Sequence, residues 1–197
     1  MIYEFIRPLT CPFEKIEKYV PKKGKILDVG CGHGLFAKLI ANKSSQREVL
    51  GIDLSKEKIR LARYGSLAKN LKFKVKKLES LKEKFDAITI IDVLYLFPLQ
   101  EKIKFFQKCK KILIKNGLII LVENGDGGDL IYRILKIQET VMTNYLKFTY
   151  TRFKGLHFLS GQGYKDILAS LGFKIKRQEN LKSIFPYPHF LIVAKVT

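Results

Sequence analysis

A glycine-rich loop between a buried strand and a helix is the sequence feature that most restricts the fold. The apolar segment Lys25–Val29 is typical of a buried strand, and Gly30–Gly34 follows it with glycine at every second position. Helical spacing of apolar residues begins directly afterwards, over Leu35–Asn42. Glycines at such a junction let the backbone turn sharply and approach a ligand closely. The segment therefore predicts a strand–loop–helix unit with a ligand at its loop.

Strands and helices alternate along the rest of the chain. Further strands are predicted at Val49–Asp53, Leu71–Val75, Phe85–Ile91 and Leu118–Val122, and helices at Pro12–Val20, from Ser55 to between Leu67 and Asn70, and at Gln100–Leu113. This alternation predicts an α/β domain with a parallel sheet and right-handed crossovers. A last helix is expected around Tyr164–Leu171. Two strands that can pair with each other, Phe173–Arg177 and Phe190–Lys195, follow it.

The length of 197 residues fits a single domain with a substantial core, and 47% of the residues are hydrophobic. Residues 1–24 are expected to form a lead-in with the first helix, and residues 124–160 an insert before the last one. Asp92 and Glu123 interrupt the longest apolar stretches, so none approaches the roughly 20 residues that a membrane span needs. The first residues lack the pattern of a signal peptide. We expect one cytoplasmic domain without a transmembrane segment.

The three cysteines, Cys11, Cys31 and Cys109, have none of the CxxC spacing that is typical of zinc sites. The absence of this spacing also argues against a disulfide framework. We therefore expect a reduced, cytosolic environment and no metal site.

The net charge is unusually positive. Lys and Arg number 37 against 18 Asp and Glu, which gives a formal net charge of +19. Such a charge attracts nucleic acid, anionic membranes and acidic substrates or carrier proteins. Lysines are spread over the whole chain, however, and most are expected on solvated faces of helices and at strand ends. The charge keeps nucleic acid among the candidate partners without identifying one.

Two acidic residues flank the glycine loop. Asp28 precedes it, and Asp53 ends the next strand about 20 residues further on, where an acid that holds ribose hydroxyls is expected. A carboxylate at Asp28 would repel a pyrophosphate, and the loop lacks both the G-x-G-x-x-G of a dinucleotide site and the Gly-Lys-Ser/Thr of a P-loop. An ammonium or sulfonium group would be attracted instead. The spacing therefore predicts a cationic, ribose-bearing cofactor.

These segments resemble a known family. Asp28–Gly34 is similar to motif I of class I S-adenosylmethionine (SAM)-dependent methyltransferases, and Gly51–Ser55 resembles their motif II. Phe85–Leu94 resembles motif IV, and Ile112–Ile120 resembles the turn before strand five. The resemblance implies SAM as the cofactor and a three-layer Rossmann-like α/β fold. Its seven strands would run in the order 3-2-1-4-5-7-6, with strand 7 antiparallel.

The resemblance also implies cofactor contacts by position in the motifs: Asp28, Gly30, Cys31, Gly32, Gly34, Asp53, Leu54, Leu78, Glu79 and Asp92. Asp28 and the glycine loop would face the methionine part of the cofactor, and Asp53 would bind the ribose hydroxyls. Leu54 would pack on the adenine, and Asp92 would lie beside the methionine part or the methyl acceptor.

The adenine end departs from the family pattern. Many members have an acid after strand three that accepts the adenine amino group, and Lys77 stands at that position here. Either Glu79 takes over this contact or the backbone amide of Leu78 alone contacts the adenine.

The motif after strand four restricts the acceptor. The segment Asp92–Tyr95 lacks the Asp/Asn-Pro-Pro-Tyr sequence of enzymes that methylate the amino groups of adenine or glutamine. No Pro-Cys stands where a cytosine C5 enzyme carries its nucleophile. Both absences weaken the nucleic-acid and protein-glutamine interpretations.

The insert at residues 124–160 is the predicted acceptor cover. Its many aromatic residues suit a small apolar, aromatic or lipid-like acceptor, although an ordinary helical cap fits equally well. The candidate catalytic residues are His157, as a base for O-methylation, and Tyr95, at the carboxyl end of strand four. Tyr187 and His189, before the last strand, could reach the acceptor or shape the turn.

Three functions therefore stay open. A methyltransferase with a small-molecule or lipid-like acceptor fits the aromatic insert and the length. An RNA methyltransferase fits the charge, but no RNA-binding module is recognisable. A non-catalytic binding module is the third, and the intact Asp28, Gly30, Gly32 and Asp53 argue against it.

Overall fold

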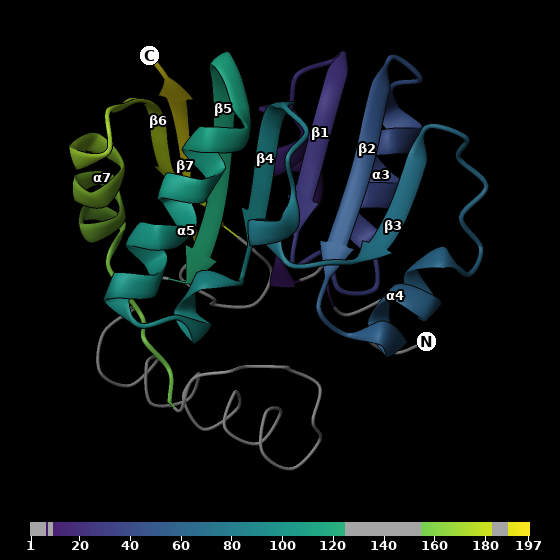
Figure 1. The fold of residues 1–197 in the computed structure, drawn as a ribbon, viewed down its shortest axis with the longest axis horizontal. Helices are drawn as coiled ribbons and strands as arrows, with labels where there is room; N and C mark the ends of the chain where they lie inside the picture. The colour runs from purple at the N-terminus through teal and green to yellow at the C-terminus, as the bar shows by residue number, and fades with distance from the viewer. Residues whose placement is uncertain (1–6, 8–9, 125–154, 183–188) are drawn as a thin grey trace.

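One seven-stranded sheet organises the part of the chain that the computed structural model describes, which is residues 7, 10–124, 155–182 and 189–197 (Figure 1). Its strands are β1 (Gly24–Val29), β2 (Arg47–Asp53), β3 (Leu71–Val75), β4 (Phe85–Ile91), β5 (Leu113–Asn124), β6 (Phe173–Asn180) and β7 (His189–Val196). They are ordered β3-β2-β1-β4-β5-β7-β6. Neighbours from β3 to β5 are parallel, and β7 is antiparallel to β5 and β6. The predicted strand order is confirmed.

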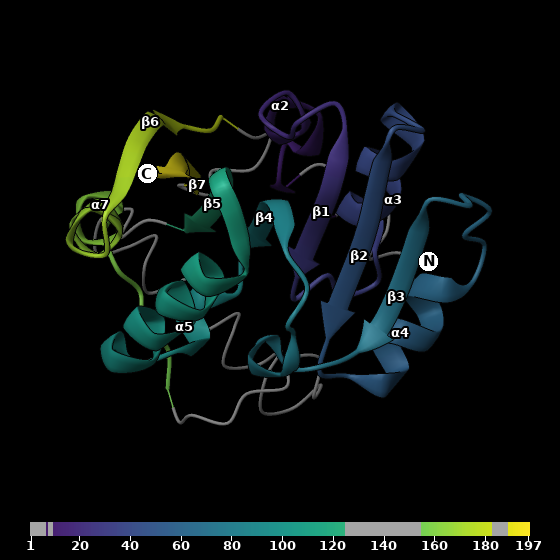
Figure 2. The same cartoon turned by 45° about the horizontal axis from the view of Figure 1, so that its top comes forward.

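Helices cover both faces of this sheet. They are α2 (Phe13–Glu17), α3 (Leu35–Lys43), α4 (Lys56–Arg63), α5 (Leu99–Ile112) and α7 (Gly161–Ser170), with the 3₁₀ turns η1 (Leu78–Ser80) and η2 (Leu94–Leu96). In Figures 1 and 2, α5 and α7 lie on one face, and α2 and α3 lie on the other. The resulting layers are those of the predicted three-layer fold.

Adjacent residues of a strand serve different cores because their side chains point to opposite faces. Leu27 of β1 belongs to the core that includes Phe106 of α5 and Leu168 of α7. Its neighbour Ile26 belongs to the core that includes Ile16 of α2 and Ile40 of α3. All six side chains are fully buried. Strands buried on both faces explain the continuous apolar runs in the sequence.

Several element boundaries differ from the prediction for local reasons. α2 ends at Glu17 instead of Val20. Proline disfavours helical geometry in the residue before it, here Val20 before Pro21. α4 ends before Gly65, whose φ of +68° is left-handed. β5 begins at Leu113 instead of Leu118, because the residues of the predicted turn form an irregularity within the strand, where the pairing with β4 shifts register. Asn116, in this irregularity, has a φ of +66°.

The topology collects several chain segments at one edge of the sheet. The carboxyl ends of the parallel strands lie there, and so do the loops that follow them. Because β7 is antiparallel, its first residue, His189, lies opposite Asn124, the last residue of β5. The first residue of β7 therefore joins the ends of β1, β2 and β4 at this edge.

Parts of the predicted lead-in and most of the predicted insert, residues 125–154, lie outside the described residues, as does Tyr187. Within the described part, no helix is both long and apolar enough to cross a bilayer.

Candidate cofactor and acceptor site

The three glycines of the loop share left-handed backbone geometry but differ in what surrounds them. All have left-handed φ angles, of +69° at Gly30, +54° at Gly32 and +77° at Gly34. A Cβ at Gly30 would lie 2.5 Å from the Val93 side chain, and one at Gly34 would lie 2.5 Å from the ring of Phe73. A Cβ at Gly32 would meet no atom within 4 Å. Gly32 is therefore the glycine whose backbone borders open space.

Asp53, at the end of β2, ties this loop to the next strand. Its Oδ2 accepts a hydrogen bond from the Gly32 amide at 3.0 Å, and its Oδ1 accepts one from the Ser55 amide at 2.8 Å. A carboxylate oxygen has two acceptor sites, so each oxygen keeps one for a further donor. The adjacent Leu54 is an exposed large hydrophobic residue. Asp53 and Leu54 thus present a pair of acceptors beside an apolar surface.

Asp28 lies beneath the loop at the end of β1 and is only 3% exposed. Its Oδ1 accepts a hydrogen bond from the Thr89 hydroxyl at 2.7 Å. Burial raises the pKa of Asp28 to about 7, with the nearby Asp53 charge adding to the effect and the Thr89 hydrogen bond opposing it. Asp28 therefore changes its charge near neutral pH.

The other predicted cofactor residues differ in their surroundings. The partly buried Cys31 has its Sγ 3.0 Å from the position of a Cβ on Gly51 of β2. Leu78, in the turn after β3, buries its side chain in the core, whereas Lys77 and Glu79 are exposed. The assignment of an adenine contact to Leu78 or Glu79 stays a prediction.

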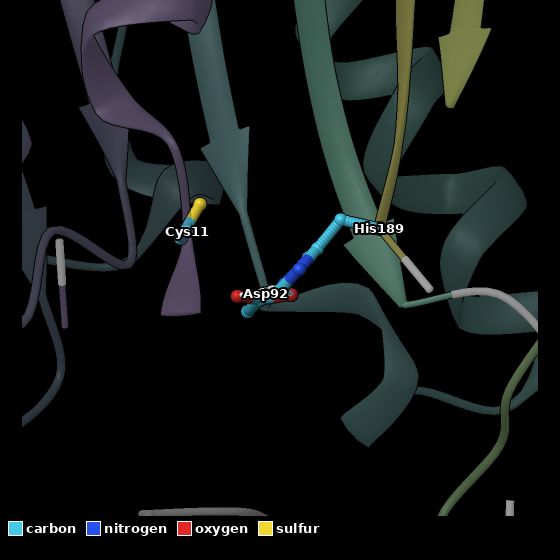
Figure 3. Close-up of side chains that lie close together, drawn as sticks. All are labelled: Cys11, Asp92 and His189. Carbon is cyan, nitrogen blue, oxygen red and sulfur yellow. Dashed lines mark hydrogen bonds and ion pairs between the residues drawn. The ribbon is translucent and has the colours of Figure 1, made fainter. Parts of the chain in front are cut away.

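A buried charged cluster surrounds Asp92, directly after β4. Its Oδ2 forms an ion pair with Arg7, and its Oδ1 accepts a hydrogen bond from the Asn124 amide at 3.1 Å. The Nε2 of His189 lies 3.1 Å from Oδ1 and 3.0 Å from Oδ2 (Figure 3). Burial favours the neutral acid, but the charges of His189 and Arg7 outweigh it and hold the pKa of Asp92 well below its usual range. Asp92 is therefore an ionised carboxylate.

Glu123 of β5 is a fully buried acid whose role the sequence did not reveal. Its Oε1 accepts hydrogen bonds from the amides of Val93 at 2.9 Å and Leu94 at 2.6 Å, and its Oε2 accepts one from Tyr95 at 3.2 Å. Burial raises the pKa of Glu123 to about 8, and the Asp92 charge adds to this, while the amides oppose it. Glu123 holds the turn after β4 in place. An acid inside an apolar run was the available signal.

A backbone hydrogen bond at that turn joins the two predicted catalytic residues. The Tyr95 carbonyl accepts a hydrogen bond from the His157 amide at 2.7 Å, and the Tyr95 ring stacks on Phe158 with centroids 5.5 Å apart. The buried Lys102 donates hydrogen bonds to the carbonyls of both His157 and Phe97. These contacts fasten the end of the predicted insert to the carboxyl edge of the sheet.

The sequence profile of a methyltransferase domain family matches residues 21–169. The chain belongs to this methyltransferase family. The resemblance to class I SAM-dependent methyltransferases, first noted at Asp28–Gly34, is thereby confirmed.

Curated relatives match part of this methyltransferase chain. It is 30% identical to a ribosomal protein L11 methyltransferase of Caldicellulosiruptor bescii over 112 residues, which are 54% of this chain and 36% of the relative. It is 31% identical to a ubiquinone biosynthesis O-methyltransferase of Pelagibacter ubique over 102 residues, 51% of this chain and 42% of the relative. The chain thus spans about two fifths of the length of these relatives.

Solved structures share the fold over nearly the whole chain. A SAM-dependent methyltransferase from Methanosarcina mazei superposes with a TM-score of 0.69 at 24% identity, covering 92% of this chain and 96% of that one. Magnesium protoporphyrin IX methyltransferase from Synechocystis, with bound S-adenosylhomocysteine, superposes with a TM-score of 0.70 at 18% identity. The match covers 99% of this chain and 83% of that one.

Proposed function

We propose that this chain transfers the methyl group of SAM to a small-molecule or lipid-like acceptor. The observation that carries the cofactor part is the Gly32–Asp53 arrangement. Gly32, in the left-handed conformation, borders open space. The Asp53 carboxylate, which accepts a hydrogen bond from the Gly32 amide, keeps acceptor sites free for ribose hydroxyls. The exposed Leu54 supplies an apolar surface for an adenine ring. These residues fit the cofactor that the family uses.

The protein's own contribution to catalysis is largely positioning. When bound, SAM supplies an electrophilic methyl group. The residues around it must orient the acceptor in line and exclude water. Glu123 fixes the turn after β4, and that turn presents the Tyr95–Phe158 stack at the same edge as the glycine loop. We assign Tyr95 to the acceptor wall and His157 to proton removal from a hydroxyl acceptor.

Two further observations bear on the acceptor. One relative is named for O-methylation in ubiquinone biosynthesis and one structural neighbour for magnesium protoporphyrin IX, which supports a small-molecule acceptor. The net charge of +19 favours RNA as the second candidate acceptor.

A transfer assay with tritiated SAM distinguishes the two candidate acceptors. Label is expected in an organic extract of cell lysate and absent from purified RNA. Label in RNA alone would exclude the small-molecule acceptor.

Asp53→Ala should weaken S-adenosylhomocysteine binding about 10- to 100-fold, because the ribose hydroxyls lose a charged acceptor worth about 1–3 kcal/mol. Isothermal titration calorimetry measures this. Asp86→Asn is the matched control, because Asp86 also accepts a backbone amide hydrogen bond, from Lys25, but stands near the start of β4, at the opposite edge of the sheet. An unchanged dissociation constant in Asp53→Ala would remove Asp53 from the ribose role. No binding by the wild type would overturn the proposed function.

Cofactor affinity should depend on pH through Asp28. Its pKa of about 7 means that the carboxyl is neutral below that pH and ionised above it. Because the methionine ammonium is attracted only to the ionised form, the affinity for S-adenosylhomocysteine should rise with pH, by up to about tenfold per unit below pH 7. Calorimetry between about pH 5.5 and 8.5 tests this. 5′-Methylthioadenosine, which lacks the ammonium, is the control ligand. Equal pH dependence for both ligands would contradict the role of Asp28.

A further inference from the structure

Three side chains with metal-binding atoms converge at the carboxyl edge of the sheet. Cys11 precedes α2, Asp92 follows β4 and His189 begins β7, so they come from distant parts of the sequence. The Cys11 sulfur, a carboxylate oxygen of Asp92 and a ring nitrogen of His189 all lie within 4.8 Å of one another (Figure 3). Cys11 and His189 are buried, and the Asp92 side chain is 9% exposed. The three donor atoms are therefore largely shielded from bulk water.

The backbone and its neighbours hold Asp92 in this position. Its φ of +53° is left-handed, a conformation that is strained for a non-glycine residue and that clusters at functional sites. Its amide donates a hydrogen bond to the Val122 carbonyl at 2.9 Å. The Asn124 amide group holds Oδ1, while the Asn124 carbonyl oxygen is buried without a hydrogen-bond partner among the described residues. A buried acceptor beside the cluster is thus left for a water or a ligand.

We propose that Cys11, Asp92 and His189 bind a Zn²⁺ ion. Sulfur, nitrogen and oxygen donors together suit zinc, whereas Mg²⁺ and Ca²⁺ take oxygen ligands. Arg7 pairs with Oδ2 of Asp92, and Oδ1 keeps a second acceptor position for the metal beside its hydrogen bond from Asn124. The 3.1 Å between His189 Nε2 and Oδ1 is close to the separation of two ligands on one tetrahedral ion. Cysteine spacing, on which the expectation of no metal rested, detects only ligands that are near in sequence.

The charges of the cluster define the fourth ligand. A Zn²⁺ ion, a Cys11 thiolate and the Asp92 carboxylate are neutral together, and Arg7 adds one positive charge. Three protein ligands leave one zinc position open. An anion completes it, either hydroxide or the ionised hydroxyl or thiol of an acceptor, and the proton of that ligand is released to water as it binds. This last step rests on the proposed function, whereas zinc binding itself does not.

The site can be tested by equilibrium dialysis. The full chain, without a histidine tag, is dialysed against micromolar free zinc. Elemental analysis should give one zinc per chain for the wild type. Cys11→Ala and His189→Asn should each weaken binding by more than the 10- to 100-fold typical of losing a residue behind the ligands. Cys109→Ala is the matched control, because Cys109 is equally buried but lies in the opposite core. Cobalt in place of zinc should show thiolate-to-metal absorption in the wild type and not in Cys11→Ala.

Arg7→Met separates a metal site from a purely structural ion-pair cluster. Removal of the positive charge should tighten zinc binding, because Arg7 repels the cation. No zinc on the wild type at this concentration, equal zinc on Cys11→Ala and Cys109→Ala, or no tightening in Arg7→Met would each overturn the zinc proposal. Calorimetry with S-adenosylhomocysteine on the same samples keeps the two proposals apart. Cofactor binding without zinc refutes only the metal site, and zinc without cofactor binding refutes the proposed function.

Discussion

Gly32→Ala should leave the domain folded and weaken S-adenosylhomocysteine binding about 100-fold. The left-handed φ of +54° costs an alanine about 1–2 kcal/mol, and its Cβ would meet no protein atom within 4 Å. That Cβ would instead occupy the open space that we assign to the cofactor. Thermal unfolding should therefore shift down by only about 2–8 °C. Calorimetry on the folded variant measures the loss of affinity.

Gly34→Ala is the contrasting variant in the same loop. Its Cβ would lie 2.5 Å from the Phe73 ring and 3.0 Å from the Ala62 Cβ, so it should lower stability much more than Gly32→Ala does. Wild-type affinity in a folded Gly32→Ala protein would show that the open space at Gly32 is not the cofactor site.

Glu123→Ala should lower the free energy of unfolding by about 3–4 kcal/mol. The change leaves the amides of Val93, Leu94 and Tyr95, the last two of them buried, without their acceptor and creates a cavity beside β4. Urea unfolding followed by circular dichroism measures the loss, which should appear in the midpoint with an unchanged slope. A loss below about 1 kcal/mol would mean that water replaces the carboxylate.

Glu123→Gln is the matched variant, because it keeps the shape and one acceptor oxygen. The pKa of Glu123 is raised from 4.5 to about 8 in the folded protein, so folding favours the protonated acid. Its contribution to stability is complete below about pH 4.5 and is lost as the pH rises to 8. Glutamine does not titrate. The stability of Glu123→Gln relative to the wild type should therefore rise between these values, and a constant difference would contradict the raised pKa.

Most of the fold could be predicted because its signals are local. Apolar periodicity gave the elements, and the glycine pattern at Gly30–Gly34 marked the first strand–helix junction. The family resemblance supplied the strand order, which local patterns do not contain. Boundaries were less accurate where one residue decided them, such as Gly65 after α4 and Asn116 within β5. Cys31 and Leu78 lie near the loop and after β3 as expected, but their contacts with a cofactor stay predictions.

The sequence by itself determined where the residues of the proposed cofactor site lie. Asp28, the glycines and Asp53 end or follow two neighbouring parallel strands, so their order along the chain already places them together. Only the tertiary structure decided the other side. The antiparallel course of β7 carries His189 back to the carboxyl edge, and burial of Glu123 in β5 brings its carboxylate to three amides after β4. The physical reason is that two strands consecutive in the chain and joined by one helix tend to pair side by side, whereas charges from distant segments meet only when the whole sheet has packed.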